Sequence, residues 1–250
     1  MANRSQPTSS ESAASWLGEW IRTILWAVGI AVVIRSLMFQ PFNIPSSSMV
    51  PTLLVGDFLF VTKFSYGYSK HSFPFSPPVL NGRIMGDEPD RGDVAVFKTP
   101  QDNRTDFIKR VVGLPGDRVQ MISGALYING EAIKRERVED FLQRDAGGNV
   151  RRARQYRETM PNGVTYMTLD LFDNGHSDDT GVFVVPEGHY FMMGDNRDNS
   201  QDSRVPGAVG FVPAENLVGK AQVLWLSTKD GAPFWQVWNW RFDRFFDKVS

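Results

Sequence analysis

The sequence places a lysine inside an apolar segment where its amine could act as a base. Residues 106–117 are typical of a strand followed by a tight turn. Because side chains alternate along a strand, Lys109 shares one face with Phe107 and Val111, and Arg110 lies on the other. Burial lowers the pKa of lysine below about 10.4, and a neutral amine can accept a proton, whereas arginine stays charged. The alternative is that Lys109 and Arg110 both reach solvent at a sheet edge.

A nucleophile is available in a second segment. Residues 44–53 read Ile-Pro-Ser-Ser-Ser-Met-Val-Pro-Thr-Leu, so that Pro45 and Pro51 bracket a serine cluster and restrict its backbone. One interpretation is a serine-rich loop without chemistry. The other is a serine held rigidly on a turn close to a membrane.

A third segment, residues 194–204, reads Gly-Asp-Asn-Arg-Asp-Asn-Ser-Gln-Asp-Ser-Arg after an apolar strand. It could be a surface turn rich in Asp and Asn. A calcium loop is disfavoured because the glycine and final glutamate of an EF-hand are missing and Arg197 and Arg204 would oppose a cation. A network of acids and bases that holds Ser200, Asp202 and Arg204 fits the composition better.

Composition excludes several other kinds of site. The chain has 250 residues with no cysteine and three histidines, so thiol nucleophiles, disulfides and cysteine metal sites are excluded, and a histidine-rich metal centre is disfavoured. The Gly-x-Ser-x-Gly, Ser-x-x-Lys and His-Glu-x-x-His motifs are missing. A formal net charge of −1 gives no general attraction to nucleic acid.

An apolar segment precedes these motifs. Residues 16–35 predict a transmembrane anchor, with Trp16 and Arg35 at its two ends, after a disordered tail at 1–15. A buried core helix and a cleaved secretory signal are the alternatives, although no small-residue cleavage site follows Ile34. The charges on either side do not decide the orientation of the anchor.

The rest of the chain predicts a mainly β fold. A β catalytic domain is expected at 40–117 and 182–228, interrupted by a smaller β-rich domain at 118–181. Asn129 and Gly130 predict the turn of a hairpin. The other expected strands are 58–62, 94–97, 107–112, 182–185, 189–193 and 221–226.

The last residues, 229–250, are rich in aromatic side chains. On a helix, Trp235, Trp238, Phe242 and Phe245 would form one apolar stripe. Such a helix could dock on the core or lie in a membrane interface.

Together the segments resemble the bacterial type I signal peptidases, serine endopeptidases with a Ser-Lys dyad. The resemblance runs from about Trp16 to Trp225 and rests on an anchor followed by three motifs in a fixed order. These motifs are Pro-Ser-Ser-Ser-Met-Val-Pro-Thr-Leu, Lys-Arg-Val-Val-Gly-Leu-Pro-Gly-Asp and Gly-Asp-Asn-Arg-Asp-Asn-Ser-x-Asp-Ser-Arg. The joint presence of the motifs makes the match specific.

The resemblance implies a role for each motif residue. It implies that Ser48 is the nucleophile, that Lys109 is the general base, and that the Ser46 hydroxyl and the Ser48 N–H form the oxyanion hole. By the same resemblance Ser200 orients the lysine, and Asp202 and Arg204 form a supporting ion pair. Shallow substrate pockets would be lined by Ile44, Pro45, Met49, Leu53, Phe107 and Ile108. Phe107 departs from the tyrosine of some members, and Ser47 receives no role.

The resemblance also implies the substrate and the location. The family cuts secretory preproteins after small-x-small sites such as Ala-x-Ala, with no cofactor and no metal. Expected partners are preproteins and membrane lipid, without nucleic acid, and the protein is expected to be monomeric. The expected location is the bacterial cytoplasmic membrane, crossed once, with the N-terminus inside and the catalytic domain on the periplasmic side.

Two rival functions remain open at this point. Another Ser-Lys peptidase, such as a self-cleaving repressor or a pilus-processing protease, would share the core. The repressor is disfavoured because no helix-turn-helix domain precedes the serines. A membrane-tethered β scaffold would explain the anchor and the sheets, but would make the pairing of Ser48 and Lys109 accidental.

Overall fold

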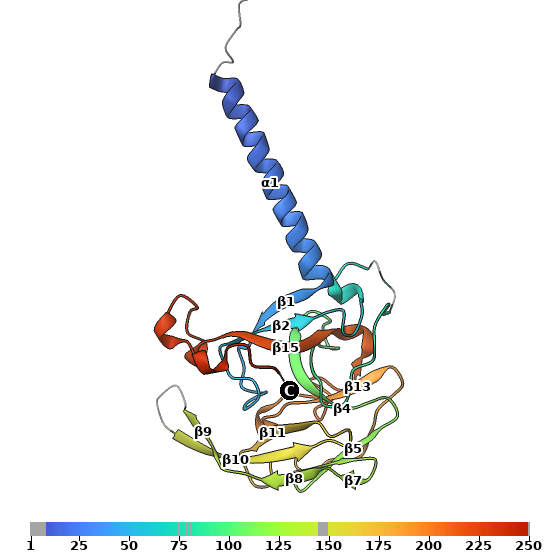
Figure 1. Ribbon diagram of the computed structural model, residues 1–250. Coiled ribbons are helices and arrows are strands. Elements are labelled where there is room, and N and C mark those ends of the chain that lie inside the picture. Colours follow the sequence, from blue (N-terminus) through green and yellow to red (C-terminus); the bar gives the residue numbers. More distant parts are fainter. Residues whose placement is uncertain (1–8, 75, 79, 81, 145–149, 250) are drawn as a thin grey trace, which may run out of the picture.

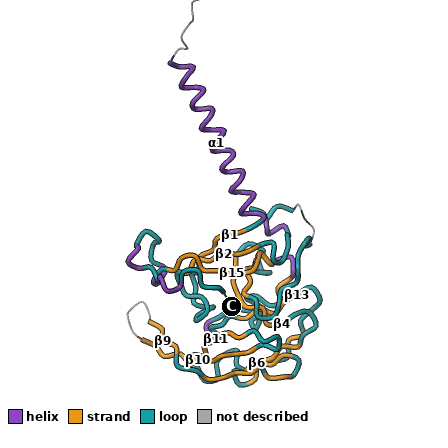
Figure 2. Tube along the Cα trace, in the orientation of Figure 1, coloured by secondary structure: helices purple, strands orange, loops and turns teal. Residues whose placement is uncertain are grey.

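The computed structural model describes residues 9–74, 76–78, 80, 82–144 and 150–249. One long helix stands away from a β-rich body in Figures 1 and 2, as the sequence predicted. The helix α1 covers Ser9–Leu37, and its segment Trp16–Leu37 is long and apolar enough to cross a membrane, with a mean hydropathy of 1.7. The apolar window of this segment has no buried residue, and within the segment Ser36 alone is buried, which contradicts the alternative of a core helix.

The start of α1 corrects one expectation. The tail predicted to be disordered covers 1–15, yet α1 begins at Ser9, so residues 9–15 are helical. Alanine favours helix, and the sequence has alanines at 13 and 14, so the helix extends about two turns before Trp16. Residues 1–8 lie outside the described part of the chain.

The largest sheet positions the chemistry. Within the described residues it has seven strands in the order β1-β2-β15-β3-β4-β13-β14, with antiparallel neighbours. Its strands are β1 (Phe39–Asn43), β2 (Asp57–Thr62), β3 (Val94–Lys98), β4 (Asp106–Gly113), β13 (His189–Met193), β14 (Val212–Pro213) and β15 (Leu217–Ser227). The predicted strands at 58–62, 94–97, 107–112, 189–193 and 221–226 all lie in this sheet.

Two smaller sheets carry the middle of the chain. One has the order β12-β5-β6-β7, and in the other β10 pairs with β8, β9 and β11. The predicted hairpin forms between β6 and β7, and Asn129 and Gly130 take the positive φ values that its turn requires. The strands are β5 (Arg118–Ile122), β6 (Ala125–Ile128), β7 (Glu131–Ala132), β8 (Lys134–Arg137), β9 (Phe141–Arg144), β10 (Val150–Thr159), β11 (Thr165–Asp170) and β12 (Phe183–Val184).

Apolar side chains pack on both faces of the large sheet. Leu59, Val61 and Val96 belong to one buried cluster, and Phe97 and Val111 belong to another. Each of these side chains is at most 1% exposed. β4 lies between β3 and β13, so its backbone is paired on both edges, and its residues from Lys109 to Gly113 are buried.

The aromatic tail is not the continuous helix that its spacing predicted. It contains three short 3₁₀ turns, η4 (Lys229–Gly231), η5 (Val237–Asn239) and η6 (Phe242–Arg244). The backbone of the tail pairs with β15 instead. Arg241 N and Phe246 N donate to carbonyls of β15, and Lys248 forms a β-bridge with Val223. This pairing takes the place of the helix that the stripe required.

Candidate active site

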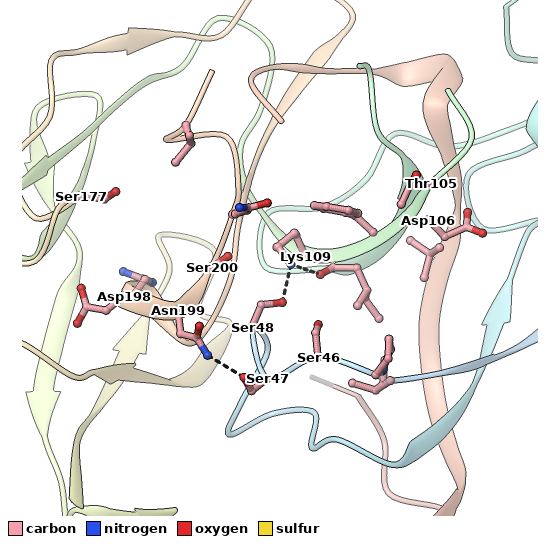
Figure 3. A pocket seen from close by; sticks show the side chains of 18 of the residues that line it. Ser46, Ser47, Ser48, Thr105, Asp106, Lys109, Ser177, Asp198, Asn199 and Ser200 are labelled. Carbon is pink, nitrogen blue, oxygen red and sulfur yellow. Dashed lines mark hydrogen bonds between the residues drawn. The ribbon is translucent and has the colours of Figure 1, made fainter. Parts of the chain in front are cut away.

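The serine cluster follows β1 and turns back toward the sheet. Ser48 is 8% exposed, and the Asn196 amide donates to its carbonyl over 3.0 Å. The Asn196 side chain also donates to the Ser47 carbonyl at 3.0 Å, and Asn199 donates to Ser47 Oγ at 2.7 Å. The loop 194–204 is therefore hydrogen-bonded to the serine cluster (Figure 3).

Lys109 reaches Ser48 from the centre of β4. Its Nζ lies 2.6 Å from Ser48 Oγ and 3.0 Å from the Ile108 carbonyl oxygen, and the side chain is 4% exposed (Figure 3). The ring of Phe107 covers Nζ at 5.4 Å from the ring centroid. The structure thus rules out the alternative in which Lys109 and Arg110 reach solvent at a sheet edge.

The surroundings of Lys109 favour its neutral form. The pKa of Lys109 is lowered from 10.5 to about 8, chiefly by burial and also by Arg204, although Asp202 and Asp195 oppose the change. About a tenth of the lysine is then neutral at pH 7, far more than for a lysine of ordinary pKa. In that form the Ser48 hydroxyl can donate its hydrogen to the lone pair of Nζ, which is the arrangement that a general base needs.

Asp202 and Arg204 form a buried, bidentate ion pair beside this lysine. Arg204 Nε donates to one carboxylate oxygen at 2.9 Å and Nη2 donates to the other at 2.8 Å. The Gly194 amide donates to Asp202 at 3.0 Å. Burial alone would raise the pKa of Asp202, but Arg204 and these hydrogen bonds outweigh it and hold the pKa low.

Ser200 lies in the same loop, on the side of Ser48 and Lys109 (Figure 3). Gly194 makes room for it, because a Cβ at that position would lie 2.2 Å from Ser200 Oγ. Among the described residues, no hydrogen bond joins Ser200 Oγ to Lys109 Nζ. Its orienting role therefore stays a prediction.

A second buried network lies on the opposite face of β4. The Arg110 guanidinium donates to Asp195 at 2.8 and 2.7 Å and to the Gly92 carbonyl at 2.7 Å. Thr52 donates to the same carboxylate at 2.6 Å. This network joins β4 to the serine segment and to the loop 194–204, a connection that the sequence analysis missed.

Another unpredicted contact ties the loop to the middle of the chain. Arg197 Nη2 lies 2.5 Å from Glu158 Oε2 on β10, and the Tyr166 hydroxyl donates to the same oxygen at 2.8 Å. All three side chains are buried. The sequence analysis noted Arg197 among the acidic residues of the loop 194–204, but nothing in it identified Glu158 as a partner.

A cleft of about 1040 Å³ opens over Ser48 and Lys109. Of the predicted pocket residues, Ile44, Pro45, Phe107 and Ile108 line it, and so does Ser46. Figure 3 shows the Ser46 hydroxyl directed into the cleft beside Ser48.

The prediction that Met49 and Leu53 line the substrate pockets is wrong. Met49 and Leu53 are 1% and 0% exposed and pack in the core with Leu59 and Val61 rather than on the wall of the cleft. The turn that follows Ser48 directs both side chains into this core cluster. The cleft continues past the serine to Phe172 and His176, which the sequence analysis did not assign to it.

The profile of the signal peptidase family, peptidase S26, matches residues 17–226. This chain belongs to that family. Signal peptidase I of Rickettsia typhi is 45% identical over 212 residues, which cover 82% of this chain and 78% of the relative. Signal peptidase I of Rickettsia conorii is 43% identical over 230 residues, covering 89% and 84%.

A crystal structure of a signal peptidase I from Enterococcus faecalis is 29% identical and covers 54% of this chain and 97% of that one, with a TM-score of 0.31. Family membership and the curated relatives identify the chain as a signal peptidase enzyme, and its structure is mainly β. Ser48, Lys109 and the loop 194–204 all lie within the segment that the family profile matches.

Proposed function

We propose that the protein is a membrane-anchored serine endopeptidase that removes N-terminal signal peptides from secreted preproteins. Cleavage follows small-x-small sites, with Ser48 as the nucleophile and Lys109 as the general base. The observation that carries this proposal is the 2.6 Å contact between Ser48 Oγ and the buried Lys109 Nζ.

In the proposed reaction the neutral Lys109 takes the proton of Ser48 as Oγ attacks the carbonyl carbon of the scissile bond. The negative charge that develops on the carbonyl oxygen is stabilised by the Ser46 hydroxyl and the Ser48 N–H. When the carbon–nitrogen bond breaks, Lys109 returns the proton to the leaving amine, and the signal peptide stays as an ester on Ser48. Water, deprotonated by Lys109, then hydrolyses that ester and restores the serine.

The cleft supports a preference for small side chains. Its wall near Ser48 carries Ile44, Pro45, Phe107 and Ile108, which are bulky or rigid. A large substrate side chain at either specificity position would collide with them. Preproteins with Ala-x-Ala sites are therefore the substrates to test first.

Membrane anchoring by α1 is the second part of the proposal. The segment Trp16–Leu37 has 22 residues, about 33 Å of helix, which matches a hydrocarbon core of about 30 Å. We place the N-terminus on the cytoplasmic side of the bacterial cytoplasmic membrane and the catalytic domain on its periplasmic side, where exported preproteins emerge. The protein acts as a monomer without a cofactor in this scheme.

The aromatic tail supports contact with lipid. Trp235 and Trp238 are 65% and 75% exposed, and Phe242 and Phe246 are 61% and 74% exposed. Tryptophan favours the membrane–water interface, so the tail of 229–250 is proposed to contact lipid although it is no helix.

The test is cleavage of a preprotein with an Ala-x-Ala site by the full chain in detergent. Ser48→Ala should abolish cleavage, whereas Ser177→Ala, a change at another serine of the same cleft, should leave it intact. Cleavage that survives Ser48→Ala would contradict the assignment of the nucleophile. A preprotein with a bulky residue in place of either alanine should resist the wild-type protein.

A further inference from the structure

A second cavity, of about 700 Å³, lies where α1 meets the β-rich body. Its wall includes Arg35 from the last turn of α1, Lys70 and His71 from η1 (Lys70–Ser72), and Lys98 and Arg104 from the region of the β3–β4 turn. The Tyr68 hydroxyl donates to the Leu37 carbonyl at 2.8 Å and so fixes the chain before η1 against the end of α1. Four cationic side chains thus surround one cavity.

The two carboxylates in the wall are already engaged. Asp102 accepts hydrogen bonds from the hydroxyls of Thr99 and Thr105 and from two backbone amides of its own turn. Asp106 pairs with Lys98 at 2.8 Å. Lys70 pairs with Glu215 at 3.6 Å, at the edge of the cavity. Within the described residues, Arg35 and Arg104 form no ion pair, and the four cations of the wall exceed Asp102, Asp106 and Glu215 by one charge.

A further cation lies behind the wall. Lys63 is 2% exposed and donates from Nζ to the Ser72 carbonyl at 2.5 Å. The pKa of Lys63 is lowered to about 8, chiefly by burial and also by the positive charges of Arg35 and Lys98, while Asp106 opposes the change. The cations are thus close enough to repel one another, and a bound anion would relieve that repulsion.

His71 supplies a hydrogen-bonding group to the same wall. It is 4% exposed, and its Nδ1 lies 3.0 Å from Ser76 Oγ. Its Nε2 has no hydrogen-bond partner among the described residues. If Nδ1 accepts from the Ser76 hydroxyl, Nε2 carries the hydrogen and can donate to an anion without carrying a charge itself.

The place of the cavity indicates which anion it meets. Arg35 lies at the end of the segment that is long enough to cross a membrane, so the cavity lies at the level of the lipid phosphates. Met38 follows α1, Phe39 begins β1 and Phe64 comes just after β2, and these side chains are 47%, 38% and 50% exposed. Phe39 and Phe64 contact each other with their centroids 5.9 Å apart. An apolar surface of this kind suits acyl chains.

We propose that this cavity binds the phosphate of an anionic phospholipid in the leaflet that faces the catalytic domain. Arg35, Lys70 and Arg104 neutralise the headgroup, His71 Nε2 donates to a phosphate oxygen, and the exposed Phe39 and Phe64 contact the acyl chains. Because Asp106 belongs to the walls of both the cavity and the active-site cleft, the bound lipid fixes the cleft relative to the membrane surface. This inference rests on the membrane anchoring proposed above.

The experiment is native mass spectrometry of the full chain in detergent with added phosphatidylglycerol. The variant Arg35→Gln/Lys70→Gln/Arg104→Gln should retain at least about tenfold less lipid than the wild type, since each cation near a lipid surface contributes severalfold to binding. The matched control Arg118→Gln/Lys134→Gln/Arg152→Gln removes the same charge from exposed positions of β5, β8 and β10 and should bind as the wild type does.

Equal lipid retention by the cavity variant and the wild type would overturn the proposal. Release of the lipid by inorganic phosphate at equal concentration would also overturn it, because the cavity would then be a site for free phosphate. Cleavage of a soluble peptide is measured on the same samples, and resistance to carbonate extraction is measured on membranes that contain the same proteins. Their loss in the wild type would count against the proposed function, and the lipid result is interpreted separately.

Discussion

Lys109 and Arg110 are adjacent cations on β4, and both are almost fully buried, yet their surroundings have opposite effects. Lys109 contacts a hydroxyl and a carbonyl and has no carboxylate within ion-pair distance among the described residues, so burial lowers its pKa to about 8. Burial would also lower the pKa of Arg110, but the Asp195 charge and hydrogen bonds outweigh it and raise the pKa. Burial alone does not decide the charge of a side chain; the partner on its own face of the strand does.

The two cations have different roles: Lys109 serves the reaction, and Arg110 holds the site together. The face of β4 that carries Lys109 opens to the cleft, where an amine that can lose its proton is useful. The opposite face needs a permanent cation, because the Asp195 carboxylate joins β4 to Thr52 and to the loop 194–204. A one-residue change of register would exchange the two roles and leave both networks without their partners.

The largest expected effect is on activity. Lys109→Met keeps the length and apolar stem of the side chain but removes the base, so cleavage should fall by at least about 10⁴-fold. The rate is measured on a preprotein in detergent, with circular dichroism to show that the variant is folded. Normal turnover would refute the assignment of the base. Lys98→Met, at a partly exposed lysine of β3, is the control for loss of a lysine.

The next effect is on stability and concerns Arg110. Asp195→Asn leaves the arginine buried without its carboxylate, and we expect the free energy of unfolding to fall by about 3–5 kcal/mol. Asp106→Asn breaks a more exposed pair with Lys98, and its cost should stay below about 1 kcal/mol. Denaturant unfolding measures both. Equal costs for the two changes would show that the buried pair is no more important than the exposed one.

The third prediction is that Lys109, although needed for activity, lowers the stability of the folded protein. A fall in its pKa from 10.5 to about 8 means that burial costs the folded state roughly 3 kcal/mol at neutral pH. Lys109→Met should remove that cost and stabilise the protein while abolishing cleavage. Between pH 8 and 10.5 the unfolded state binds more protons than the folded state, so this lysine makes wild-type stability rise with pH. A destabilised Lys109→Met protein at neutral pH would contradict the account.

The smallest effect concerns the predicted orienting serine. Ser200→Ala should slow turnover by about tenfold without abolishing it, since it removes one possible hydrogen bond to the lysine. The pH at which activity appears should also move, which a purely structural change would not cause. A wild-type rate and an unchanged pH profile would remove the orienting role.

The sequence predicted the elements of the site better than their surroundings. Alternation in β4 put Lys109 on an apolar face, and the resemblance selected Ser48 from three consecutive serines. The burial of Met49 and Leu53 could not be predicted, because it depends on the path of the turn after Ser48. The contact of Arg197 with Glu158 joins residues far apart in the chain, and no local pattern pairs them.

The tail of 229–250 also shows that contacts between distant segments decide a local structure. The spacing of its aromatic residues favoured a helix, but β15 offers backbone partners beyond the end of β3, and pairing with them took precedence. Local spacing is a weak guide where a neighbouring strand edge is open.

The central claim is that Lys109 acts as a neutral amine. The pH dependence of kcat/KM for a soluble peptide substrate tests it most directly, because it reports the essential ionisations of the free enzyme. We predict that activity rises with pH as a single group with a pKa near 8 loses its proton. A rise governed by a pKa near 10.5, the ordinary value for lysine, would contradict the claim.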